Sequence, residues 1–185
     1  MRNPSPLVIF IVVTFGTHLA AHTQNICEAD ALPSEAKSFV SKTFPGWRLK
    51  LTSDLVDYDQ KVWAEEHPKE CPGIAIGHFE ASDQTAYGLL LIAKSGPKTG
   101  YKIVVVSRST TTDRYSVRVL DHAEGQPGAD SGLVISKVPP GKYSGFDTTQ
   151  SVQLGLDGLE AEWIEKSSVL YFWKNSRYHT LQTSD

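Results

Sequence analysis

The sequence predicts an α+β fold, in which two N-terminal helices pack on a twisted antiparallel β-sheet or meander. Before Gly73, apolar residues recur at spacings of three and four, which is the period of a helix with one buried face. From Gly73 onward, short β-branched or aromatic runs alternate with clusters of Gly, Pro, Asp and Ser, as in strands joined by turns. The helical and the strand patterns are therefore separated along the chain, which is typical of α+β domains.

The first 23 residues have the pattern of an export signal. Arg2 supplies a positive end, and residues 7–15 form an almost unbroken apolar run that is too short to span a membrane. Small residues that suit cleavage follow at Ala20, Ala21 and Thr23. Cleavage after Ala21 and cleavage after Thr23 fit the pattern equally well. We therefore expect residues 1–23 to be a signal peptide.

Removal of this signal leaves residues 24–185, which is the size of one α+β domain. The domain would act in a periplasm or outside the cell. Its basic residues are scattered singly in a chain of net charge −3, so nucleic acid is not an expected partner. We expect no membrane contact after signal cleavage, no bound cofactor or metal, and a monomer.

The chain has two cysteines, Cys27 and Cys71, and exported proteins meet an oxidising compartment in which such pairs usually close. We expect a disulfide between them, although two separate thiols would also fit the sequence. The bridge would close a loop of about 44 residues. Because no second cysteine is near either one in sequence, a redox motif and a Cys-rich zinc site are excluded.

The first expected helix begins at Pro33 or Ser34, and Pro45 and Gly46 end it. Its buried face is formed by residues spaced three and four apart, namely Leu32, Ala36, Phe39, Val40 and Phe44.

The second expected helix covers residues 58–66, with Asp57 as its N-cap, Gln60 as the capping-box partner and Pro68 just past its end. Val62 and Trp63 are its expected buried residues. Residues 47–51 between the two helices alternate apolar and basic side chains, which predicts a short strand with Trp47, Leu49 and Leu51 facing inward.

The expected strands fill the rest of the chain, and loops are expected at residues 125–132 and 139–147. The strands are expected at residues 74–79, 87–93, 101–107, 114–120, 133–138, 151–156, 159–164, 169–173 and 177–181. Asp157 and Gly158 form a two-residue type I′ turn signal, which predicts a hairpin between the two strands that flank it. A second hairpin is expected around Asn175, a residue type that can take a positive φ.

The expected strand at residues 114–120 has two unlike faces. Alternation places Tyr115, Val117 and Val119 on one side and Arg114, Ser116 and Arg118 on the other. One of the two sheet faces should therefore meet water.

The most motif-like part of the mature chain lies between Cys71 and Ile92. It combines Cys-Pro-Gly at residues 71–73, Gly-His-Phe-Glu-Ala-Ser-Asp at residues 77–83, and Tyr-Gly-Leu-Leu-Leu at residues 87–91. This segment resembles a degenerate form of one in uncharacterised exported bacterial proteins, in which a strand ending in Gly-Asp-Phe leads into an Asp-rich turn of the FG-GAP or VCBS type. The resemblance covers about 20 residues, and it implies a hairpin but no activity.

Calcium binding by this segment is not expected. A calcium loop needs several oxygen ligands, usually carboxylates at alternating positions. Here His78 stands in the place of one Asp and Ala86 in the place of another, which leaves Glu80, Ser82 and Asp83. We therefore interpret the segment as a β-hairpin with a polar turn.

His78 and Glu80 lie two residues apart on an expected strand, so both side chains project from one face and could form a metal-binding or an acid/base pair. Completing such a site would require a third group from a distant strand. A solvated polar face is the simpler interpretation. No motif for a nucleophilic serine or for phosphate binding is present in the sequence.

Aromatic residues near the C-terminus are the remaining candidates for binding. Tyr171 and Trp173 share one face of an expected strand, and Tyr178 lies across the turn. Exposed tyrosine and tryptophan would form a binding surface for protein or sugar. Burial against the residues of the two helices is the alternative.

These patterns favour an exported, non-catalytic binding or interaction module whose partner is an unknown protein or cell-envelope component. Its candidate binding residues are His78, Glu80, Asp83, Tyr171, Trp173 and Tyr178. The first alternative is a small extracytoplasmic hydrolase that uses His78 with Glu80, and the second is a structural envelope component.

Overall fold

The computed structural model of the chain describes residues 27, 31–94, 99–147 and 149–185. The expected signal peptide, residues 1–23, lies outside the described residues. No helix in the described ranges is long and apolar enough to cross a membrane.

The described residues form two α-helices, a short 3₁₀-helix, η1, and eleven strands. In chain order the elements are α1 (Ser34–Thr43), β1 (Trp47–Leu49), η1 (Thr52–Asp54), α2 (Asp57–Glu66), β2 (Ile74–Gly77), β3 (Ala86–Ala93), β4 (Gly100–Arg108), β5 (Tyr115–Glu124), β6 (Leu133–Val138), β7 (Lys142–Ser144), β8 (Ser151–Gln153), β9 (Gly158–Trp163), β10 (Ser167–Lys174) and β11 (Arg177–Ser184). The expected content of antiparallel sheet with two helices is confirmed.

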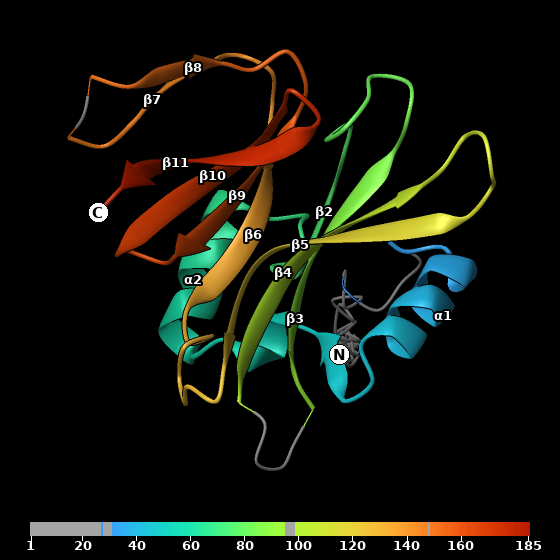
Figure 1. Cartoon of the computed structure of the whole chain (residues 1–185). Coiled ribbons are helices and arrows are strands. Elements are labelled where there is room, and N and C mark those ends of the chain that lie inside the picture. The colour runs from blue at the N-terminus through green and yellow to red at the C-terminus, as the bar shows by residue number, and fades with distance from the viewer. Residues whose placement is uncertain (1–26, 28–30, 95–98, 148) are drawn as a thin grey trace, which may run out of the picture.

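The strands form two main sheets, where the sequence predicted one sheet or meander (Figure 1). The first sheet has the order β1-β3-β4-β5, and β2 also pairs with β3, beside β1. The second sheet has the order β11-β10-β9-β6, and β7 and β8 form a separate hairpin. Every pair of neighbouring strands is antiparallel. Apolar alternation predicts strands but not how they divide into sheets, so this division could not be predicted.

Among the described residues, the apolar cluster with the most buried side chains lies between the two sheets. It joins residues such as Phe79, Leu90 and Ile103 from the side of the first sheet to Leu133 and Leu159 of the second. This cluster fixes the two sheets face to face and so determines which side chains meet at their edges.

The helices contact different parts of this framework. Ala36 of α1 is buried in a second cluster with Leu89 and Val104 of the first sheet. Trp63 of α2 packs instead with Val134 of β6 and with Ile164, which directly follows β9. Each helix therefore covers a separate apolar surface.

The expected hairpin at Asp157 and Gly158 is wrong. β8 pairs with β7, and β9 starts at Gly158 and pairs with β6 and β10. Gly158 packs closely against Leu170, since a Cβ there would lie 2.6 Å from Cδ1 of Leu170 and would displace that side chain. The Asp157 carboxylate accepts a hydrogen bond from the backbone N–H of His78 at 2.8 Å. Both residues therefore serve tertiary contacts and not a local turn.

The hairpin expected around Asn175 is confirmed. β10 and β11 pair directly, and Asn175 and Ser176 have φ values of 52° and 61°, as a type I′ turn requires. The hairpin expected from the segment between Cys71 and Ile92 is also present, as β2 and β3.

The region around β1 differs from the expected alternation. Trp47 is buried as expected, but Leu49 and Leu51 are only partly buried, whereas Lys50 is 1% exposed. The amino group of Lys50 donates a hydrogen bond to the carbonyl of Asp130. A lysine can be buried when its head finds such an acceptor, and the sequence pattern does not reveal a partner 80 residues away.

The expected disulfide is present. Cys27 and Cys71 are bridged with a Cα–Cα distance of 5.1 Å, across a sequence separation of 44 residues. The backbone of Cys71 also forms an isolated β-bridge with Ile74, at the start of β2. The disulfide therefore fixes the chain immediately before β2.

Candidate functional site

Glu80 lies in a polar cluster between the first and the second sheet. Its side chain is 12% exposed and its two oxygens have different partners. Arg118 Nε donates to Oε1 at 2.7 Å, and Ser107 Oγ donates to Oε2 at 3.0 Å. Glu80 is therefore held by groups from β4 and β5, and both of its oxygens already accept hydrogen bonds.

Arg118 joins Glu80 to two of the aromatic candidates. Its guanidinium lies 4.8 Å from the centroid of the Trp173 ring, and the Tyr178 ring packs edge-on against Trp173 at 5.0 Å. The Tyr178 hydroxyl is buried beside Glu80 but makes no well-formed hydrogen bond with any described residue. Burial, and then the charge of Glu80, raises the pKa of Tyr178.

The structure therefore brings together Glu80, Trp173 and Tyr178 around Arg118, which sequence reasoning did not select. The sequence feature that could have indicated Arg118 is the alternation that places Ser116 and Arg118 on one face of β5. The sequence predicted that one face of this strand meets water. Ser116 and Arg118 are exposed, yet their face also meets the second sheet. Because the Trp173 ring is covered by Arg118 and Tyr178, this cluster joins the two sheets and offers no bare aromatic platform.

Tyr171 is buried elsewhere, against the carboxylate of Asp121. The hydroxyl groups of Tyr171 and Tyr101 both donate to Asp121 Oδ2, at 3.2 and 3.0 Å. Burial, and then the Asp121 charge, raises the pKa of both phenols. Since Tyr101 belongs to β4 and Tyr171 to β10, one carboxylate joins the two sheets.

We expect Asp121→Ala to lower the free energy of unfolding by about 1 to 2 kcal/mol, because two buried hydroxyls lose their acceptor. Wild-type stability should also fall above about pH 10, the ordinary tyrosine pKa. There the unfolded phenols lose protons that the folded ones retain. The fall should be smaller in Asp121→Ala, because the carboxylate no longer opposes ionisation of the two phenols.

Urea denaturation across pH measures both effects. Asp83→Asn, at an exposed carboxylate, is the control, and equal losses in the two variants would contradict the prediction.

His78 and Asp83 lie away from the Glu80 cluster. His78 is exposed, with its Nδ1 3.2 Å from the carbonyl oxygen of Gln84. Asp83 is exposed at the rim of an open groove of about 420 Å³, beside Arg108 and Tyr115. His78 and Glu80 share no hydrogen bond or ion pair with each other. Within the described residues, no group of three or more His, Cys, Asp and Glu side chains is arranged to hold a metal ion.

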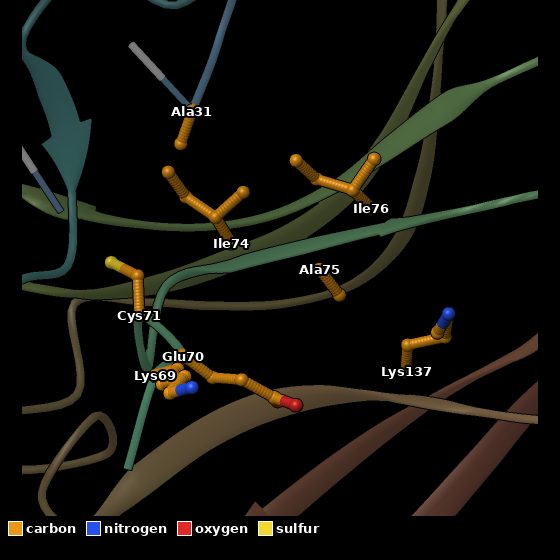
Figure 2. Close-up of a pocket in the computed structure, with 8 residues that line it drawn as sticks. All are labelled: Ala31, Lys69, Glu70, Cys71, Ile74, Ala75, Ile76 and Lys137. Atoms are coloured by element: carbon orange, nitrogen blue, oxygen red, sulfur yellow. The ribbon is translucent and has the colours of Figure 1, made fainter. Parts of the chain in front are cut away.

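A smaller pocket of about 270 Å³ lies at the edge of β2, and we call it the β2 pocket (Figure 2). Ile76, with 42% of its surface exposed, lies on its apolar side. Figure 2 shows Ala31, Ile74 and Ile76 on one side of the β2 ribbon, and Glu70 and Lys137 on the other. The lining residues are Ala31, Lys69, Glu70, Cys71, Ile74, Ala75, Ile76 and Lys137.

The backbone of β2 presents unpaired polar groups to this pocket. Leu90 N–H donates to the Gly73 carbonyl at 3.0 Å, so Gly73 faces β3. Backbone groups alternate in direction along a strand, so Ile76 directs its N–H and C=O away from β3. Among the residues that the structure describes, none forms a hydrogen bond to either group.

Strand β6 forms the opposite border of the pocket. Its Ile135 N–H donates to the Pro72 carbonyl at 2.9 Å, which joins the edges of the two sheets just before β2 begins. By the same alternation, Lys137 directs its backbone groups toward the side of β2 and away from β9. The pocket therefore lies between the edges of β2 and β6, which meet where the Ile135 N–H donates to the Pro72 carbonyl.

The charges at the rim of the pocket are unbalanced. The Glu70 carboxylate lies 3.2 Å from the Nδ1 of His67, within ion-pair distance. In the described part of the chain, Lys69 and Lys137 have no ion-pair partner. The rim therefore favours a negatively charged group in a ligand.

Sequence reasoning missed this pocket. The only signal for it was the run Ile74-Ala75-Ile76, in which an edge strand exposes one isoleucine. Lys137 joins the pocket through the contact between β2 and β6, and nothing in the pattern of either strand predicts that contact.

Comparison with protein-family models, with curated proteins and with solved structures found no match for this chain. The geometry of the β2 pocket is therefore the basis for a functional assignment.

Proposed function

We propose that this protein is an exported, non-catalytic binding module that holds its partner at the β2 pocket. The observation that carries the proposal is the exposed Ile76, whose side chain lines a pocket of about 270 Å³ and whose backbone groups have no partner among the described residues. Exposed apolar surface beside unpaired backbone is costly in isolation, so its burial by a partner gives binding energy.

Export is part of the proposal. The signal-like residues 1–23 and the Cys27–Cys71 disulfide support action in a periplasm or outside the cell, where disulfides persist. The likeness to exported bacterial proteins with FG-GAP or VCBS-type turns stays a prediction from residues 71–92. In this proposal the two N-terminal helices support the sheets, and the mature chain is a monomer that binds a protein or a cell-envelope component.

The geometry favours binding over hydrolysis by His78 and Glu80. Glu80 is occupied by Arg118 and Ser107, and His78 lies against the Gln84 carbonyl, so the two side chains act on separate neighbours. A structural role in the envelope would predict co-purification with an envelope assembly. A binding module predicts instead a partner whose retention depends on Ile76.

We expect Ile76→Lys to abolish retention of the partner from envelope extract, because a charge would enter the apolar side of the pocket. The matched control is Val119→Lys, at another exposed apolar residue, 49% exposed on the edge strand β5. The measurement is quantitative mass spectrometry of what the immobilised domain retains. Identical retention by wild type and Ile76→Lys would contradict the proposal, as would loss with both variants.

A further inference from the structure

The free edge of β2 has the features that receive an additional strand. Ile76 offers one N–H and one C=O that point out of the first sheet, and such unpaired edges are the template for added strands. We propose that the ligand of the β2 pocket is an extended peptide segment of a partner protein, which adds to the first sheet beside β2. This inference rests on the proposed binding function and specifies the class of ligand.

The volume of the pocket accommodates a peptide side chain and lies near the lower limit for pockets that enclose small molecules. Pockets that enclose drug-sized ligands have volumes of about 300 to 1,000 Å³. The β2 pocket, at about 270 Å³, lies below this range. In strand addition, main-chain hydrogen bonds give affinity, and small pockets for alternate side chains give specificity.

The two sides of the pocket predict the pattern of the peptide. Successive side chains of an added strand point to opposite faces of the sheet. One set would meet Ala31, Ile74 and Ile76, which are apolar, and the next set would lie on the side of Glu70 and Lys137 (Figure 2). Lys69 and Lys137 outnumber the Glu70 carboxylate, so an acidic side chain is favoured there. A segment in which apolar and acidic side chains alternate fits both sides.

The charge of the rim also distinguishes a different protein from a second copy of this chain. Pairing β2 with the β2 strand of another copy would bring Lys69, Glu70 and Lys137 of both copies to one groove, where the lysines outnumber the carboxylates and the excess like charge is unfavourable. A partner with carboxylates at this position would instead neutralise the two lysines.

The test uses pools of capped peptides of about eight residues, a length typical of a strand. In the first pool Val, Ile or Leu alternates with Glu or Asp. In the second, Lys or Arg replaces the acidic residues. We expect the mature protein to bind the acidic pool at least about tenfold more tightly in fluorescence anisotropy. Lys137→Glu should reverse this preference, and Lys174→Glu, at the exposed last residue of β10, should leave it unchanged.

Backbone methylation separates strand addition from insertion of a side chain alone. N-methyl groups on one alternate set of peptide amides should abolish binding, and on the other set they should leave it intact, because only one set faces β2. Amide hydrogen exchange at Ile76 should slow when the acidic pool binds. Equal effects of the two methylated sets, or unchanged exchange at Ile76, would overturn the inference.

The outcomes also separate this inference from the proposed function. If no peptide pool binds while Ile76→Lys still loses the partner from envelope extract, the binding function stands and the peptide inference fails. If neither occurs, both fail. A dimer in light scattering that Ile76→Lys dissociates would identify a second copy as the occupant and would overturn the inference.

Discussion

Loss of the Cys27–Cys71 disulfide is expected to lower the free energy of unfolding by about 3 to 4 kcal/mol. The bridge closes a loop of 44 residues, and closing a loop of this length reduces the conformational entropy of the unfolded chain by that order. The melting temperature should fall by about 10 °C. The measurement is urea denaturation of the wild type and of the double variant Cys27→Ala and Cys71→Ala.

Reduction of the wild-type protein provides the matched control, because both sulfur atoms remain in the buried cluster around α1 while the cross-link is removed. If the reduced protein and the double variant lose similar stability, the cross-link is the cause. If the reduced protein retains its stability and only the double variant loses it, the contribution comes from packing, and the prediction is wrong.

This disulfide also bears on the β2 pocket. Cys71 lines the pocket, and its backbone forms a β-bridge with Ile74. The carbonyl of the neighbouring Pro72 accepts a hydrogen bond from the Ile135 N–H. The cross-link therefore restrains the segment that joins the edges of the two sheets. An oxidising compartment would keep the site assembled, in agreement with the proposed export.

Local signals in the sequence predicted local structure well. The positive φ of Asn175 and Ser176 and the pairing of β10 with β11 depend on residues close in sequence, and this hairpin was predicted. Asp157 and Gly158 carry an equally strong turn signal, but both residues make tertiary contacts in the structure. The Asp157 carboxylate accepts a hydrogen bond from His78, and Gly158, which has no side chain, packs against Leu170. A tertiary contact overrode the local preference.

The candidate site shows the same limit. Glu80, Trp173 and Tyr178 were selected for residue type, and the structure brings them together, but the residue that joins them is Arg118 of β5. The β2 pocket depends on Lys137 of β6, which lies more than 60 residues after Ile76. Alternation indicates that a strand has two faces, but it does not indicate which strand of another sheet will lie against an edge.

Lys50 is the clearest case of a side chain whose environment the sequence misassigned, and its substitution should have a large effect. Lys50→Ala is expected to lower the free energy of unfolding by about 3 kcal/mol, because it leaves a cavity where a long side chain was buried. Lys50→Met retains most of the volume and removes the buried charge. Its stability at neutral pH should lie within about 1 kcal/mol of the wild type, since removal of the charge offsets the lost hydrogen bond to Asp130.

The pH dependence of the free energy of unfolding tests whether the buried charge of Lys50 is the cause. Burial lowers the pKa of Lys50 below its ordinary value of 10.5, although Asp130 and Asp54 oppose the shift. Between the folded and the unfolded pKa, the unfolded chain binds a proton that the folded chain does not, so stability contributed by Lys50 rises with pH. Below the folded pKa both states are protonated, and the cost of the buried charge is present in full.

The wild type should therefore gain stability relative to Lys50→Met as the pH rises toward 10.5. Tyrosine ionisation affects both proteins equally and cancels in the difference. A difference that is flat across this range would show that the Lys50 amino group keeps its ordinary pKa in the folded protein.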